Sequence, residues 1–119
     1  MRITNIIAIT GLLCFPLSGF ASETLNGDQL KETFSGNTFQ WQHLLKSMYG
    51  KTYYAADGTL TGTLNGSKRE GTWHISGNEI CLSWGKCIPI ESDGNGNYYK
   101  SNGFKRVLRI KKLGDGNLL

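Results

Sequence analysis

The feature that most constrains this chain is the segment Thr72–Ile90, TWHISGNEICLSWGKCIPI, which contains Cys81 and Cys87. Apolar and polar residues alternate along it, and a period of two is typical of strands whose two faces have different surroundings. Gly77-Asn78 interrupts the alternation with residues that suit a tight hairpin turn. The segment therefore predicts a meander of short antiparallel strands with two cysteines on neighbouring strands.

The N-terminal residues predict export. Arg2 supplies a positive charge, the apolar run Ile6–Phe20 follows, and Gly19 and Ala21 are small residues suitably placed for cleavage after Ala21. This is the layout of a secretory signal peptide. A retained membrane anchor is the alternative, but Pro16 interrupts a run that is short of the ~20 apolar residues that a membrane span needs.

Removing residues 1–21 as a signal peptide would leave residues 22–119, which are 98 residues and enough for a single β-rich exported domain. This domain keeps 12 basic and nine acidic residues, a net charge of +3 that permits an anionic partner without demanding one. No second apolar run approaches membrane-spanning length, so we expect no membrane span in the mature chain. We expect the domain to be periplasmic or secreted.

The two cysteines of residues 22–119 are expected to pair with each other. The predicted strands Glu79–Leu82 and Lys86–Ile90 fold back around Ser83-Trp84-Gly85 and place Cys81 opposite Cys87. Directly opposed residues have Cβ atoms about 4.5–5.5 Å apart, which is close to disulfide geometry. A redox pair usually has the spacing Cys-x-x-Cys, and a zinc site needs two more ligands. The pattern therefore favours a structural disulfide and predicts no metal site and no cofactor.

The rest of the chain predicts an all-β fold with one short helix. Asn26 precedes a predicted helix that extends to Phe34, with Gln29 as its capping-box partner. Turns rich in glycine separate seven or eight alternating segments, which is typical of a small antiparallel meander barrel or sandwich. The segment His43–Gly50 fits a helical turn as well as a strand. The predicted strands are Thr38–Gln42, Lys51–Ala55, Thr59–Leu64, Gly71–Ser76, Glu79–Leu82, Lys86–Ile90, Tyr98–Ser101 and Phe104–Leu113.

The last predicted strand, Phe104–Leu113, is strongly basic. Alternation places Lys105, Arg109 and Lys111 on one face, where they suit the phosphate, sulfate or carboxylate groups of an anionic polymer or the surface of a protein partner. The alternative is an edge strand whose lysines prevent edge-to-edge pairing, and we favour it on the sequence alone.

The sequence contains no recognisable catalytic constellation. His43 and His74 are the two histidines, and alternation predicts that His74 faces solvent. Two carboxylates facing one cleft would support a hydrolase. The candidates lie at or beside predicted turns, where acids are ordinarily solvated: Asp57, Glu70, Glu79, Glu91 and Asp93. The run Asp93–Asn97 lacks the later ligands of a calcium loop, so we expect a hairpin turn there.

Four segments resemble a group of small exported bacterial β-rich proteins of unknown function. They are YYAADGTLTG (Tyr53–Gly62), GTWHISGNEICLSW (Gly71–Trp84), the second cysteine Cys87, and GDGN (Gly114–Asn117). The chain departs from the simpler pattern of this group in the Gln40–Gly50 insert. The resemblance implies a β-rich domain in the periplasm or outside the cell, and it implies no catalytic residue and no ligand.

These patterns together predict a non-catalytic binding or interaction module acting in the cell envelope or on a host. A hydrolase of envelope or host polymers, using carboxylates from the turn loops, is the alternative. A small-molecule carrier is a third hypothesis, and it requires an unfilled barrel interior. We expect Trp41, Trp73 and other large side chains to occupy that space instead.

Overall fold

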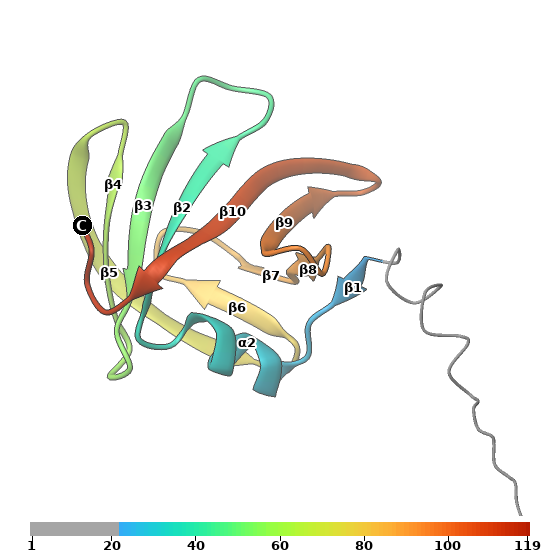
Figure 1. The fold of residues 1–119 in the computed structure, drawn as a ribbon, viewed down its shortest axis with the longest axis horizontal. Helices are drawn as coiled ribbons and strands as arrows, with labels where there is room; N and C mark the ends of the chain where they lie inside the picture. The colour runs from blue at the N-terminus through green and yellow to red at the C-terminus, as the bar shows by residue number, and fades with distance from the viewer. Residues whose placement is uncertain (1–21) are drawn as a thin grey trace, which may run out of the picture.

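The computed structural model describes residues 22–119, which form one helix and ten strands joined into one antiparallel sheet (Figure 1). This confirms the all-β fold with a short helix; the predicted signal peptide lies outside the described residues. The helix is α2 (Gly27–Phe34). The strands are β1 (Glu23–Thr24), β2 (Asn37–His43), β3 (Tyr49–Tyr54), β4 (Thr59–Leu64), β5 (Ser67–Ser76), β6 (Glu79–Leu82), β7 (Cys87–Ile88), β8 (Glu91–Ser92), β9 (Asn97–Asn102) and β10 (Lys105–Asp115).

The sheet curls into a half-barrel with the strand order β1-β8-β9-β10-β2-β3-β4-β5-β6-β7 (Figure 1). β7 and β8 follow each other in the chain but are not hydrogen-bonded to each other. Pro89 and Ile90 connect β7, one edge strand of the sheet, to β8, which pairs with β1 and β9. Pro89 fits in this connection because proline has no amide N–H to donate to a ladder. The carbonyl oxygen of Ile90 accepts a hydrogen bond from the Leu25 amide at 2.9 Å.

The structure has more strands than the seven or eight expected, and the differences lie in short segments. β1 and β8 have two residues each, too few to stand out as an alternating pattern. The predicted strand Lys86–Ile90 shortens to β7 because Pro89 ends its pairing. The segment that fitted both helix and strand is a hairpin between β2 and β3, in which the His43 amide donates to the Met48 carbonyl at 2.8 Å.

The helix α2 begins at the predicted capping box. The Gln29 amide donates to Asn26 Oδ1 at 2.9 Å, and the Asn26 amide donates to Gln29 Oε1 at 2.8 Å. The Gly27 amide donates to Asn78 Oδ1 at 3.0 Å and ties the helix to the turn between β5 and β6. Because α2 contacts β2, β5 and β6, it covers one end of the half-barrel (Figure 1).

Phe34, the last residue of α2, lies at the centre of an aromatic cluster inside that end. Its ring centroid is 4.5 Å from that of Phe39, 5.0 Å from that of Tyr54 and 5.9 Å from that of Tyr98. Leu30, one helical turn earlier on the same face, is also completely buried. Burial of apolar surface at about 25 cal/mol per Å² is what holds this short helix to the sheet.

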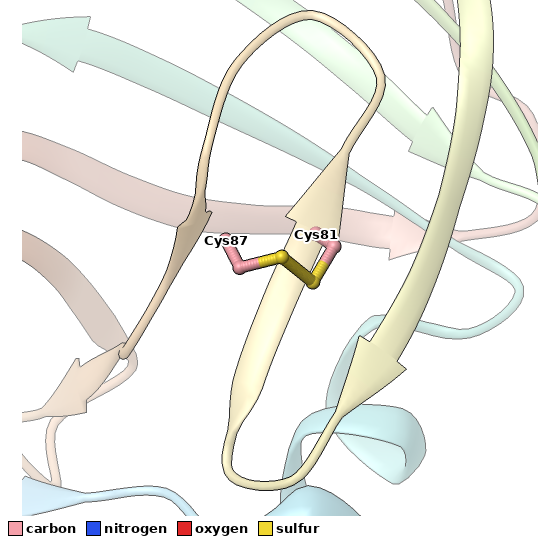
Figure 2. Close-up of a disulfide and its surroundings, with 2 residues drawn as sticks. All are labelled: Cys81 and Cys87. Atoms are coloured by element: carbon pink, nitrogen blue, oxygen red, sulfur yellow. A yellow bond between two sulfur atoms is a disulfide. The ribbon is translucent and has the colours of Figure 1, made fainter.

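The predicted disulfide links Cys81 on β6 to Cys87 on β7 (Figure 2). The two residues are direct partners in the ladder, with Cα atoms 4.0 Å apart. On the strand at the other side of β6, His74 of β5 is the ladder partner of Cys81. The next ladder pair, Ile75 and Ile80, faces the interior. The bridge therefore lies on the outer face of the sheet, and His74 is exposed as predicted.

Replacing both cysteines (Cys81→Ser with Cys87→Ser) should lower the free energy of unfolding by about 2 kcal/mol, because the bridge closes a short loop of the unfolded chain. For a domain of this size the loss corresponds to a fall in Tm of roughly 10 °C, measured by circular dichroism. A reducing agent should produce the same fall in the wild type and none in the double variant. A wild-type midpoint that does not respond to reduction would contradict the prediction.

Candidate functional site

A cavity of about 310 Å³ lies inside the half-barrel. Most of its lining is apolar and includes Trp41, Trp84, Ile88, Leu108 and Ile110. The expectation that Trp41, Trp73 and other large side chains occupy the whole interior is therefore wrong, although Trp73 does belong to the buried core. Trp41 lines the cavity without filling it, and Trp73 packs beside Tyr54 with ring centroids 5.5 Å apart.

Three glycines on the inner face explain why the interior stays open. A Cβ atom at Gly50 would lie 2.8 Å from Trp41 Cζ2, and one at Gly62 would lie 3.1 Å from Trp84 Cη2. At Gly71 the same atom would lie 2.7 Å from Trp84 Nε1. Both indole rings thus lie directly against the backbone of these glycines. Because the rings lie so close to the wall, the space between them and the opposite side of the half-barrel stays open.

The polar groups of the lining are basic or neutral. Within residues 22–119, His43, Arg69 and Lys100 line the cavity and no aspartate or glutamate does. The Nδ1 atom of His43 accepts hydrogen bonds from the Leu45 and Lys46 amides, both at 3.1 Å. A neutral His43 ring therefore carries its proton on Nε2, where it can act as a donor.

Two neutral hydroxyl groups also belong to the cavity wall. Thr52 is 3% exposed and Tyr54 is 6% exposed, and both line the cavity. Burial raises the pKa of Tyr54 above its ordinary value, so its phenol stays protonated at neutral pH. These side chains offer hydrogen bonds without adding negative charge.

Arg69 on β5 is the most unusual group of the lining. Its guanidinium carbon lies 3.9 Å from the centroid of the Trp84 ring, a cation–π contact. Its Nε is buried and has no hydrogen-bond partner among the described residues. The neighbours Lys68 and Glu70 alternate to the outer face, where they pair with each other at 3.8 Å. Burial lowers the pKa of Arg69, but an arginine remains protonated at neutral pH.

A β-bulge changes the predicted basic face of the last strand. Arg106 pairs with Ser101 and Leu108 pairs with Lys100, so Val107 is an extra residue in β10. An extra residue inverts the alternation, and positions before and after it exchange faces. Val107 lines the cavity beside Leu108.

The bulge separates the three predicted site residues. Arg109 is opposite Tyr99 and Lys111 is opposite Asn97, so these two basic residues share the outer face as predicted. Lys105 is opposite Asn102, which lies an odd number of positions from Tyr99 along β9 and therefore faces the other side of the sheet. The prediction that Lys105 shares a face with Arg109 and Lys111 is wrong. Arg106 lies on the outer face instead, with its guanidinium carbon 3.8 Å from the Tyr99 ring centroid.

β10 is not an edge strand, which overturns the explanation that we favoured for its lysines. It lies between β9 and β2, because the β8–β9 hairpin and β1 extend the sheet beyond it. On the outer face Lys111 is opposite Gln40, and Gln40 is opposite Lys51 on β3. Arg109 Nη2 donates to Gln42 Oε1 at 2.9 Å. We call Lys51, Arg109 and Lys111 the basic outer surface; the sequence could not reveal Lys51 because its strand lies far from β10 in the chain.

The acidic residues of the turns have local roles. Asp57 accepts from the Thr59 amide at 2.9 Å, and Asp93 accepts from the Asn95 amide at 2.7 Å. These backbone hydrogen bonds lower the pKa of both carboxyls. The run beginning at Asp93 forms the predicted hairpin turn, in which the Asp93 amide donates to the Asn97 carbonyl at 3.2 Å.

The described part of the chain contains no group of three or more His, Cys, Asp or Glu residues arranged to hold a metal ion. It also contains no helix long and apolar enough to cross a bilayer. Comparison of the chain with protein-family models, with curated proteins and with solved structures gives no match. The resemblance to small exported bacterial proteins stays a prediction, and the function is argued from the site alone.

Substituting Gly62→Ala should destabilise the fold by about 1–3 kcal/mol, because the new methyl group overpacks the wall. It would lie 2.7 Å from the Lys51 carbonyl oxygen and 3.1 Å from Trp84. Gly85→Ala is the matched control, since a Cβ there meets no atom within 4 Å. Urea unfolding followed by tryptophan fluorescence measures both. Equal stability of the two variants would contradict the packing described for the wall.

Proposed function

We propose that the protein is an exported, non-catalytic binding protein that holds a small, largely apolar ligand inside its half-barrel. The observation that supports this is the cavity of about 310 Å³ with an apolar wall and a few polar groups. Protein interiors are normally close-packed, and cavities of roughly 300–1,000 Å³ with this composition are typical of small-molecule sites.

The apolar wall also indicates how such a ligand gains affinity. Each buried methylene group contributes about 0.8 kcal/mol, and part of the sum is lost in fixing the ligand. An alkyl chain of moderate length, such as that of decanol, is therefore expected to bind with a Kd on the order of tens of micromolar, or about −6 kcal/mol.

Export is part of the proposal. The pattern of residues 1–21 supports a periplasmic or secreted location, and so does the disulfide, since such bonds persist in oxidising compartments. The hydrolase alternative lacks comparable support, because within residues 22–119 the cavity lining holds no carboxylate pair. We therefore do not propose it.

A cavity-filling variant tests the proposed ligand site. Val107→Phe adds a large side chain to the lining and should weaken decanol binding at least about tenfold. Thr72→Phe, on the exposed outer face of β5, is the matched control and should bind as the wild type does. Calorimetric titration gives the affinities, and circular dichroism shows that the variants are folded. Unchanged binding by folded Val107→Phe, or no binding by the wild type, would contradict the proposal.

A second candidate function, binding of an anionic polymer, is favoured by the basic outer surface. Lys51, Arg109 and Lys111 come from two different strands and lie in the middle of the sheet rather than at its edge. The direct ladder partners described above for these three residues are amides and a tyrosine. None of the ion pairs formed within residues 22–119 includes any of the three. A polymer that carries sulfate or phosphate groups would match this surface.

The triple variant Lys51→Gln, Arg109→Gln and Lys111→Gln should bind heparin about tenfold more weakly at moderate salt and with a smaller salt dependence, because fewer counterions are released. The matched control removes three exposed lysines elsewhere, with Lys31, Lys86 and Lys105 replaced by Gln. The two triple variants have the same net charge. A difference in the salt concentration at which they elute from a heparin column therefore reports binding by the basic outer surface rather than an effect of net charge. Equal elution of the two triple variants would contradict a binding role for the basic outer surface.

A further inference from the structure

Arg69 places a positive charge with a free donor in the wall of an otherwise apolar cavity. Its Nε is buried and unpartnered among residues 22–119, and none of the ion pairs formed there includes Arg69. Removing such a group from water without a compensating partner is unfavourable. The stacking on Trp84 offsets part of this cost but satisfies no N–H group.

The contacts around Arg69 orient its guanidinium over the Trp84 ring. Trp84 is itself fixed, because its Nε1 donates to the Glu70 carbonyl at 3.0 Å. Gly62 is the direct ladder partner of Arg69 and has no side chain that could compete for the space between them. Stacking covers one face of the planar guanidinium and leaves the donors at its edge available, which is the geometry that binds a carboxylate with two parallel hydrogen bonds.

We propose that the ligand of the cavity carries a carboxylate at one end of its apolar chain and that Arg69 binds this carboxylate. The inference rests on the proposed function and deepens it by giving the ligand class, a fatty-acid-like monocarboxylate. A carboxylate matches a single guanidinium in charge and in shape, and it is compact enough to leave most of the 310 Å³ to the chain.

Lys100 and His43 are the other basic groups of the lining, and the test must separate them from Arg69. Lys100 is half-buried on the inner face of β9, opposite Leu108. Its ammonium is a strongly hydrated point charge on a flexible stem, without the planar fork of arginine. His43 already uses Nδ1 for two backbone amides and offers Nε2 alone. Arg69 is the lining residue with several donors and a fixed orientation.

The test compares decanoate with decanol, which share a chain and differ in charge. Three proteins are prepared as residues 22–119: the wild type, Arg69→Gln and Lys100→Gln. Each is titrated with each ligand at pH 7, and binding is followed by calorimetry and by tryptophan fluorescence, to which Trp41 and Trp84 of the lining contribute. We expect the wild type to bind decanoate about tenfold more tightly than decanol. Arg69→Gln should remove this preference, so that it binds decanoate no more tightly than decanol, while Lys100→Gln should keep the preference.

Circular dichroism and urea unfolding show whether Arg69→Gln is folded, independently of ligand binding. Arg69→Lys adds a second check, because it keeps the charge and loses the fork, and it should recover only part of the preference for decanoate. Equal binding of decanoate and decanol by the wild type would overturn the inference and leave the proposed function standing. Loss of the preference in Lys100→Gln alone would overturn the role of Arg69. Absence of binding of either ligand to the wild type would overturn the proposed function and this inference together.

Discussion

The burial of Phe34 is the interaction on which the rest of the structure depends. This one side chain, at the end of an eight-residue helix, contacts rings from three strands: Phe39 of β2, Tyr54 of β3 and Tyr98 of β9. The sheet is not closed into a barrel by hydrogen bonds, and the intrinsic twist of its strands does not by itself fix how tightly it curls, so the tightness of the curl needs another cause. Packing around Phe34 supplies it, because the three strands can all reach that ring only if the sheet bends around the helix.

The same packing sets the limits of the cavity. Aromatic rings fill the end of the half-barrel next to α2, whereas further along the wall glycine faces indole instead of another large side chain. Gly50 accommodates Trp41, and Gly62 and Gly71 accommodate Trp84. A tightly packed end thus supports a wall in which each indole ring is held against glycine backbone. A wall fixed in this way would limit the entropy lost when the proposed ligand binds.

Local signals in the sequence predicted much of the fold. The capping box at Asn26, the glycine turns and the Cys81–Cys87 pair each depend on residues close together in the chain. The central position of β10 and the contribution of Lys51 to its surface depend on strand order, which alternation does not contain. The bulge at Val107 did have a signal, two adjacent apolar residues in an alternating strand, but strict alternation overlooked it. An unfilled interior was only a third hypothesis on the sequence, because glycines and indoles from separate segments of the chain meet only in the folded sheet.

The short connection between β7 and β8 determines which strands form the edges of the sheet. Ile88 and Ile90 lie on either side of Pro89, and both line the cavity. β8 pairs with β9 and β1 rather than with β7, so the chain passes from one end of the sheet to the other end within two residues, and the edge strands are β7 and β1. The disulfide fixes β7 to β6, whereas β1 is held to β8 by a two-residue ladder. The end of the sheet that is held by a covalent bond should therefore open less readily than the end that is held by a two-residue strand.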